Sequence, residues 1–372
     1  MNGRGESPGH FFDRDDLTTM NRNDSNHFNG LTQELWDFSD LVLKNRFAKA
    51  LDVGAARYPI FRELRFAARI ELDVLLDAIA IDDAWRAQRI HSTSLILDGD
   101  GLFVSGHGGR KADYCSCAFY IWAVDVPRAE GAKERILEKA GSTLITEPMF
   151  SIDWHFTSCS GLQNAAIEEL ANDVLRDRAY PEIKSGVRNF IACYLDAPET
   201  VLVLQGPPGT GKTRLIRAIL GEMSRRKGAH GHALYTGDME ALASDEIYVK
   251  FITGGHDAFV VEDADHLMKP RAEGNEHLHR FLTIADGVVR SQGRKIIFST
   301  NLPNVGDLDD ALIRPGRCFA RIHVRTLTGA EAQALADEIA GGDAEKLARV
   351  SVTLAAEGGR KHSLAEIYRA LR

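Results

Sequence analysis

The stretch VLVLQGPPGTGKTRLIRAIL, residues 201–220, decides the fold. Its apolar first residues predict a buried strand, and apolar residues recur at helical spacing in its second half. Between them lies a cluster of glycine and proline that ends in Lys212 and Thr213. Glycines let the backbone wrap around an anion with its N–H groups, and the following helix N-terminus adds favourable partial charge. The pattern G-x-x-x-x-G-K-T in a strand–loop–helix context predicts a site for a nucleoside triphosphate.

Each residue type in this loop suits a phosphate and its counterion. Lys212 supplies a cation, and the hydroxyl of Thr213 is a ligand for Mg²⁺. We therefore expect ATP and Mg²⁺ as cofactors. The residues expected to contact the nucleotide are Gly206, Pro207, Pro208, Gly209, Thr210, Gly211, Lys212, Thr213 and Arg214.

Three further landmarks follow the loop along the chain. The stretch AFVVEDADHL places the carboxylates Glu262 and Asp263 directly after an apolar strand, where they suit Mg²⁺ and an attacking water. Asn301 ends another apolar strand, KIIFSTN, and is placed to contact the γ-phosphate or the water. The segment DLDDALIRPGRC then carries Arg314 and Arg317 three residues apart.

These four motifs, in this order and spacing, resemble those of the AAA+ ATPases, and the R-P-G-R segment resembles that of the AAA clade. The resemblance covers about residues 180–370 and implies an αβα sandwich with a helical lid, assembled as a ring that is usually a hexamer. It also implies Asn301 as a polar sensor. Arg314 and Arg317 are implied to be fingers that complete the site of a neighbouring subunit, where they supply charge to the transition state.

The chain departs from the family pattern in its two carboxylates. The usual Asp-Glu order is reversed, so that Glu262 falls at the Mg²⁺ position, together with Thr213, and Asp263 at the position of the catalytic base. The side chain of Asp263 is one methylene shorter than the usual glutamate, so its reach to water requires a backbone shift or a different water position. A similar order occurs in AAA proteins resembling the mitochondrial Rieske-protein translocase.

A second departure concerns the handling of a substrate chain. Threading members of the family carry an aromatic residue in a pore loop, but the corresponding segment DMEALASDE has none, and Tyr248 is expected to pack on a helix instead. Lys269 and Arg271 lie in a loop that either faces the pore or is simply exposed. His266, His277 and His279 are not spaced to converge on a metal.

The alternation of patterns predicts an α/β fold: a parallel-sheet αβα domain with a helical lid, preceded by a smaller α+β domain. The expected divisions are a polar tail at 1–36, an α+β partner-recruiting domain at 37–160, a linker with helical character at 161–195, the nucleotide-binding domain at 196–327 and the lid at 328–372. Expected helices include 37–51 and 60–81, and 161–177 is expected to be a helix or loop. Expected parallel strands are 201–205, 232–236, 257–262, 294–300 and 320–325.

Composition bounds the possible partners and the compartment. The 372 residues are 44% hydrophobic and 26% charged, with a net charge of −8, which argues against nucleic acid as a general partner. No apolar run is long enough for a membrane span, and the N-terminus lacks the apolar centre of a signal peptide. Five cysteines, an odd number, indicate a reducing environment, and we expect a cytoplasmic protein.

The leading hypothesis is an ATP-hydrolysing protein remodeller, similar to a chaperone or translocase. It would act as a homo-oligomeric, hexameric ring whose N-terminal domain recruits a protein partner. Two alternatives remain open at this stage. One is a nucleotide-dependent assembly switch with slow turnover, consistent with the short Asp263 side chain. The other is a nucleic-acid motor or loader that uses Lys269 and Arg271. The sequence identifies neither the partner nor the ring size.

Overall fold

The computed structural model describes residues 45, 58–159, 161–171, 174–227, 230–268, 278–285, 293–303, 309–355 and 360–371. The chain divides into two compact units, Met1–Ile145 and Thr146–Arg372. The tail expected at 1–36 lies outside the described residues, as does the helix expected at 37–51 except for residue 45.

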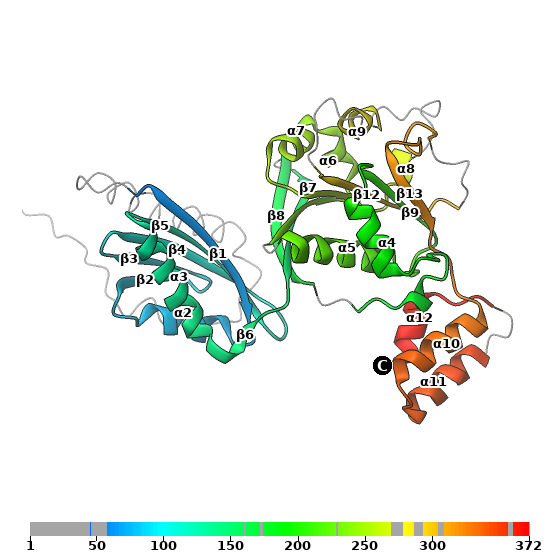
Figure 1. Ribbon diagram of the computed structural model, residues 1–372, viewed down its shortest axis with the longest axis horizontal. Coiled ribbons are helices and arrows are strands. Elements are labelled where there is room, and N and C mark those ends of the chain that lie inside the picture. The colour runs from blue at the N-terminus through cyan, green and yellow to red at the C-terminus, as the bar shows by residue number, and fades with distance from the viewer. Residues whose placement is uncertain are drawn as a thin grey trace, which may run out of the picture. The chain divides into compact units, whose positions relative to one another are not determined.

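The described part of the first unit is an antiparallel sheet in the order β2-β3-β4-β5-β1-β6, with two helices packed against one face (Figure 1). Alternate strand residues, such as Leu95 and Leu97, meet apolar helix residues, such as Leu75 and Ile136, in one buried core. Its elements are β1 (Ile60–Ala68), α2 (Leu72–Ala80), β2 (Trp85–His91), β3 (Ser94–Gly99), β4 (Leu102–Arg110), β5 (Cys115–Ala123), α3 (Val126–Ala140) and β6 (Leu144–Ile145).

The helix expected at 60–81 was wrong over its first half. Residues Ile60–Ala68 form strand β1, and the helix is confined to Leu72–Ala80. Every second residue of the strand, from Leu64 to Ala68, enters the core, while the residues between them lie on the other face. Nine residue pairs with β5 hold this conformation. Because that partner lies about fifty residues downstream, the local pattern could not reveal it.

The second unit contains a sheet in the order β13-β9-β12-β11-β10-β7-β8, whose strands are parallel except for β8. Its described elements before the sheet edge are β7 (Met149–Ser158), β8 (Gly161–Leu170), α4 (Val187–Asp196), β9 (Val201–Gln205), α5 (Lys212–Lys227), β10 (Gly231–Thr236), α6 (Met239–Ala243), α7 (Asp245–Thr253), β11 (Ala258–Val261), α8 (Asp265–Met268), α9 (Leu278–Ala285), β12 (Lys295–Thr300) and β13 (Cys318–His323). The parallel strands lie close to the expected ranges, although β13 begins two residues earlier than expected.

Helices cover both faces of this sheet, which is why its central strands are apolar throughout. Leu202 and Leu204 of β9 face the core formed with α4 and α5, whereas Val201 and Val203 face the core formed with α6, α7, α8 and α9. Figure 1 shows these two helical layers on either side of the strands. The αβα sandwich expected from the sequence is confirmed.

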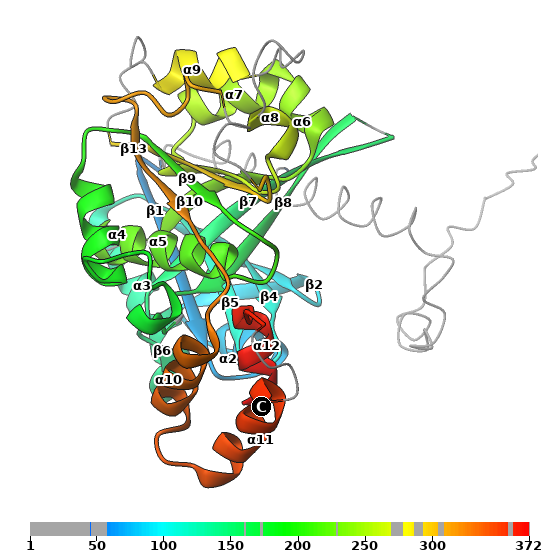
Figure 2. The same ribbon diagram turned by 90° about the vertical axis from the view of Figure 1, so that its right-hand side faces the viewer.

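The hairpin of β7 and β8 corrects two expectations. Residues 161–170 form a strand rather than a helix or loop, paired with β7 over ten positions. Strand β7 itself continues the parallel sheet by pairing with β10, so it belongs to the second unit and not to the N-terminal domain expected at 37–160. Figure 2 shows the far end of this hairpin extending past the neighbouring strands.

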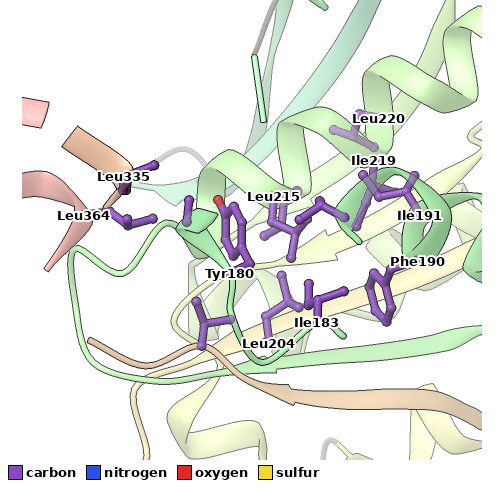
Figure 3. Close-up of a cluster of buried hydrophobic side chains, with 14 of the residues drawn as sticks. Tyr180, Ile183, Phe190, Ile191, Leu204, Leu215, Ile219, Leu220, Leu335 and Leu364 are labelled. Carbon is purple, nitrogen blue, oxygen red and sulfur yellow. The ribbon is translucent and has the colours of Figure 1, made fainter. Parts of the chain in front are cut away.

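The helices that follow the sheet are α10 (Gly329–Ala340), α11 (Ala344–Ala355) and α12 (Leu364–Ala370), as expected for a lid. Their apolar residues join the core of the αβα sandwich. Figure 3 shows Leu335 of α10 and Leu364 of α12 beside Tyr180, near Leu215 of α5. The lid is therefore packed against the segment that precedes α4 and against the glycine-rich loop.

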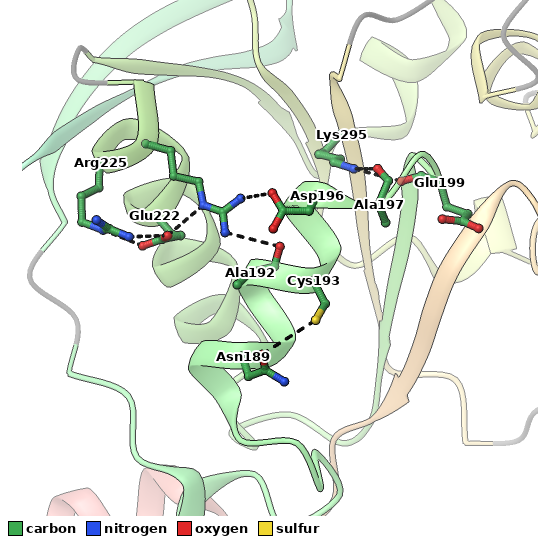
Figure 4. Close-up of polar contacts among 10 residues, drawn as sticks. Asn189, Ala192, Cys193, Asp196, Ala197, Glu199, Glu222, Arg225 and Lys295 are labelled. Atoms are coloured by element: carbon green, nitrogen blue, oxygen red, sulfur yellow. Dashed lines mark hydrogen bonds and ion pairs between the residues drawn. The ribbon is translucent and has the colours of Figure 1, made fainter.

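A buried lysine ties the start of β12 to the turn after α4. The ammonium of Lys295 donates to the carbonyl oxygens of Ala197 at 2.7 Å and Glu199 at 3.0 Å (Figure 4). Burial lowers the pKa of Lys295 to about 8. In the same region the carboxylate of Asp196 accepts from Arg226 at 2.5 Å, which links the end of α4 to α5. These contacts stabilise the edge of the sheet at which the parallel strands begin.

Candidate nucleotide-binding site

The glycine-rich loop connects β9 to α5 at the carboxyl edge of the sheet, and two of its glycines are required by their surroundings. Gly206 has a φ of 153°, and a Cβ there would lie 1.9 Å from the carbonyl oxygen of Val324. Gly211 has a φ of 97°, and a Cβ there would lie 2.7 Å from Leu364 Cδ1. Side chains are thus excluded from a loop whose backbone must remain open to an anion.

Lys212 at the start of α5 is buried, and its ammonium has three acceptors. It donates to the carbonyl oxygens of Gly206 at 2.7 Å and Pro207 at 3.1 Å, and to Asn301 Oδ1 at 2.9 Å. Burial lowers the pKa of Lys212, while nearby carboxylates, Asp263 foremost, oppose that shift. The cation predicted from the sequence therefore lies inside the loop and already contacts the predicted sensor.

The two predicted metal ligands contact each other. The hydroxyl of Thr213 donates to Glu262 Oε1 at 2.6 Å, and the phenol of Tyr235 donates to Glu262 Oε2 at 2.7 Å. A hydroxyl and a carboxylate are the hard oxygen ligands that Mg²⁺ prefers, and Mg²⁺ commonly takes only one or two protein ligands beside phosphate and water. The donor set at this position therefore fits the ion.

Asp263 and Asn301 form a second pair beside the first. Asn301 Nδ2 donates to Asp263 Oδ1 at 2.9 Å, so that the amide of Asn301 bridges Asp263 and Lys212. Asp263 has a φ of 50°, the one positive value among the described residues other than glycine. At this turn the carboxylate of Asp263 points towards the amide of Asn301.

Asp265, the first residue of α8, accepts hydrogen bonds from the end of β12. Its Oδ1 accepts from the hydroxyl of Thr300 and from the backbone N–H of Asn301, both at 2.7 Å. These bonds fix the end of β12 and hence the backbone of Asn301. The backbone of Asn301, the predicted sensor, is thus held by the first residue of α8.

A cavity of about 520 Å³ lies where these groups converge. It combines the glycine-rich loop, the ends of β11 and β12, and the first turns of α12. Its lining includes Pro208, Gly209, Gly211, Lys212, Thr213, Arg214, Glu262, Asp263, Ser299, Asn301, Leu364, Ala365 and Tyr368. Three other residues expected to contact the nucleotide, Gly206, Pro207 and Thr210, belong to the loop but are not part of this lining. The Thr210 hydroxyl donates to the carbonyl oxygen of Pro207 within the loop.

Sequence reasoning missed the contribution of α12 to this cavity. The backbone N–H of Ala365 donates to the carbonyl oxygen of Gly209 at 3.1 Å. The guanidinium of Arg214 lies 4.4 Å from the centre of the Tyr368 ring. Tyr180 was also missed, and its hydroxyl donates to the carbonyl oxygen of Gly211 at 3.0 Å. No local pattern marks these residues, since the chain brings them to the loop only through tertiary packing.

The two arginines of the R-P-G-R segment are not among the described residues that line this cavity. Arg314 is exposed. Arg317 is half-buried, and its guanidinium donates to the carbonyl oxygen of Ala311 in the same chain. The two arginines therefore differ in their surroundings, a difference that the sequence did not indicate.

The structure also bears on the remaining sequence hypotheses. Tyr248 of α7 is buried, and its ring packs against Phe281 of α9, in line with the expected packing on a helix. Its hydroxyl donates to the carbonyl oxygen of Leu242 at 2.9 Å. The connection between α6 and α7 is the single residue Ser244. The described residues contain no cluster of three or more His, Cys, Asp or Glu side chains that could hold a metal ion. Lys269, Arg271 and His277 lie outside the described residues.

Part of the chain that builds this site matches a family of known proteins. Residues 202–326 match the model of the ATPase family associated with various cellular activities (AAA). Similar proteins include the ATP-dependent zinc metalloprotease YME1 homolog of Caenorhabditis elegans, 28% identical over 64% of this chain and 34% of that protein. The peroxisomal ATPase PEX6 of Mus musculus is 27% identical over 56% of this chain and 20% of that protein.

A third relative is the ATP-dependent zinc metalloprotease FtsH of Clostridium perfringens, 32% identical over 37% of this chain and 20% of that protein. The chain thus spans about a third or less of the length of these curated relatives. In the described part of the chain, no helix is both long and apolar enough to cross a membrane.

Proposed function

Because residues 202–326 form an AAA ATPase domain, preceded by an additional N-terminal region, we propose that this chain hydrolyses ATP to ADP and phosphate. We propose further that it uses this cycle to remodel a protein partner. The observation that carries the proposal is the convergence of Lys212, Thr213, Glu262, Asp263 and Asn301 on one cavity at the carboxyl edge of the sheet. Ligands of open α/β sheets bind at this edge.

The side chains divide the reaction among them. Lys212 binds the β- and γ-phosphates in place of its present carbonyl acceptors, and Thr213 and Glu262 hold Mg²⁺. The bound ion neutralises phosphate charge. Asp263 accepts the proton of the attacking water, and Asn301 orients Asp263 through the 2.9 Å hydrogen bond. The lid helix α12 lines the same cavity with Leu364, Ala365 and Tyr368 and restricts the access of water.

The proposed assembly is a homo-oligomeric ring, hexameric as is usual in the family, with ATP at the boundary between subunits. Support comes from the exposed Arg314, which does not line its own chain's cavity and is therefore available to a neighbour. The first unit has a hydrophobic core of its own, and it is our candidate for the region that recruits the protein partner. A cytoplasmic location also remains part of the proposal.

The first test is ATP turnover by the purified chain with Mg²⁺. Lys212→Ala removes a charge-assisted contact with phosphate, which contributes about 1.5–3 kcal/mol, so we expect nucleotide affinity to fall by about tenfold or more. Lys227→Ala is the matched control, since Lys227 lies at the other end of α5 and pairs with Asp257 on the surface. Equal ATP affinity in the wild type and Lys212→Ala would contradict the proposed site.

The partner can be sought with a trapped state. Asp263→Asn removes the proposed base while the phosphate ligands remain, so the variant should hold ATP and retain whatever the ATP-bound ring engages. Stimulation of the wild-type ATPase by the recovered protein supports remodelling. Stimulation by DNA or RNA instead, lost as salt rises, would favour a nucleic-acid motor. Assembly that follows ATP binding, with slow turnover and no stimulation, would favour a switch.

A further inference from the structure

The carboxylate of Glu262 has a donor at each oxygen. Thr213 supplies one from the helix that follows the glycine-rich loop, at 2.6 Å, and Tyr235 supplies the other from β10, at 2.7 Å. Short hydrogen bonds between a hydroxyl and a charged carboxylate are stronger than neutral ones. The orientation of Glu262 is therefore determined by two elements that meet only in the folded sheet.

Tyr235 reaches Glu262 because of the sheet topology. Tyr235 is the penultimate residue of β10, and Glu262 directly follows the neighbouring strand β11, so the parallel register brings both to the same edge. The ring of Tyr235 is partly buried against the core beneath α4 and α5, which restricts its rotation. Its hydroxyl extends from this packed ring towards the position that the ion would take.

The hydrogen bond from Tyr235 offsets the greater flexibility that a glutamate has at this position. Compared with the aspartate usual at this position, Glu262 has an additional methylene and hence an additional rotatable bond. Ordering that bond costs conformational entropy. A second donor at Oε2 restricts the side chain, so that Oε1 stays beside Thr213 at the proposed Mg²⁺ position. A glutamate held at one oxygen alone would sample other rotamers.

We propose that Tyr235 is a positioning residue for Mg²⁺ binding, acting through Glu262. The inference rests on the proposed function of the site. Tyr235 does not itself line the cavity, and the contact that links it to the site is the one with Glu262, so its effect should be specific to the ion-bound state of the nucleotide. A merely structural tyrosine would affect nucleotide binding equally with and without Mg²⁺.

The test compares Tyr235→Phe with the wild-type 372-residue chain. Binding of a fluorescent ATP analogue is titrated first in EDTA and then with increasing Mg²⁺. Loss of a residue that supports a metal ligand typically costs 10-fold to 100-fold in metal affinity, so we expect the Mg²⁺ midpoint to rise by about that factor. The affinity measured in EDTA should be unchanged. ATPase activity should be recovered in part at high Mg²⁺.

Two further variants complete the test: one controls for the loss of a tyrosine hydroxyl elsewhere in the fold, and the other asks whether Tyr235 acts through Glu262. Tyr248→Phe removes the hydroxyl of a second tyrosine, which donates a hydrogen bond to the carbonyl oxygen of Leu242 away from the site. This variant should leave the Mg²⁺ midpoint unchanged. Glu262→Asp shortens the side chain that Tyr235 contacts. If Tyr235 acts through Glu262, adding Tyr235→Phe to Glu262→Asp should shift the midpoint much less than Tyr235→Phe does alone.

An unchanged Mg²⁺ midpoint in Tyr235→Phe, or an equal loss of affinity in EDTA and in Mg²⁺, overturns the role of Tyr235. So does a shift of the same size in the Glu262→Asp background. In each case the wild type still binds Mg²⁺ and ATP, so the proposed function stands. A wild type that binds no ATP in either condition overturns the proposed function as well.

Discussion

His155 on β7 is buried, and neither of its ring nitrogens has a hydrogen-bond partner among the described residues. Burial lowers its pKa to about 4 from an ordinary value of 6.5. The charged groups that face it are Lys250 and His256, which act in the same direction, and Asp153, which opposes them. The folded protein therefore keeps this imidazole neutral at pH values where the unfolded chain would protonate it.

This difference predicts a pH-dependent loss of stability. Because the pKa is lower in the folded state, the contribution of His155 is fully present above pH 6.5 and is lost as pH falls from 6.5 towards about 4. The free energy of unfolding, measured with urea from about pH 7 to about pH 5, should fall more steeply for the wild type than for His155→Leu. Parallel curves for the two proteins would show that His155 does not contribute to the pH dependence.

At the scale of elements, the short helix α12 lines the candidate site with three of its residues, Leu364, Ala365 and Tyr368. A capping box of Ser363 and Glu366 fixes the beginning of the helix, and the adjacent N–H of Ala365 is bonded to the glycine-rich loop. Leu364 is buried, and its side chain lies close to Gly211 of the loop. A seven-residue helix is not stable by itself, so its position depends on this packing.

Truncating Leu364 should therefore affect both stability and binding. A buried leucine replaced by alanine costs about 2–5 kcal/mol of unfolding free energy, so Leu364→Ala should be destabilised by an amount in this range. Its nucleotide affinity should fall too, because α12 is no longer held over the loop. Leu335→Ala in α10 is the matched control, since Leu335 lies in the same core but does not line the cavity (Figure 3).

Thermal unfolding and titration with a fluorescent nucleotide separate the two effects. Both variants should lose stability, and only Leu364→Ala should lose affinity at a temperature where each is folded. If Leu335→Ala loses as much affinity as Leu364→Ala, the lid acts on the site only through general stability.

At the scale of the whole molecule, the proposed ring makes activity a property of subunit pairs. Arg314 is the better candidate for the residue that acts across the boundary, because Arg317 already bonds to Ala311 in its own chain. A finger arginine accelerates phosphoryl transfer by about 10³–10⁵-fold, so Arg314→Ala should still bind ATP but lose most of its turnover. Arg317→Ala should in addition lose stability.

Mixing tests whether the arginine acts on a neighbour. Arg314→Ala and Lys212→Ala proteins, each inactive alone, should regain part of the activity when combined, because an intact loop can then face an intact arginine. Co-purification of differently tagged variants verifies that mixed assemblies form. Mixed assemblies without activity indicate either an arginine that acts within its own chain or a ring that needs most sites intact. Small additions of Arg314→Ala to the wild type separate these, since ring-wide coupling predicts a loss steeper than the mutant fraction.

The local sequence was sufficient for features that depend on neighbouring residues. The glycine-rich loop and the apolar parallel strands are both marked by residues a few positions apart. The paired carboxylates and Asn301 could be placed because parallel strands end at the same edge of a sheet. These signals pointed to most of the side chains that converge on the candidate site, including Lys212, Thr213 and Glu262.

Tertiary structure decided the features that depend on distant partners. Residues 60–68 and 161–170 contain patterns compatible with helix, and only pairing with β5 and β7 makes them strands. Tyr235 and α12 reach the site through the sheet register and through packing against the loop. The physical reason is common to these cases. Backbone propensities are weak compared with the free energy of completing a sheet or burying an apolar face, and those terms depend on residues far away in the chain.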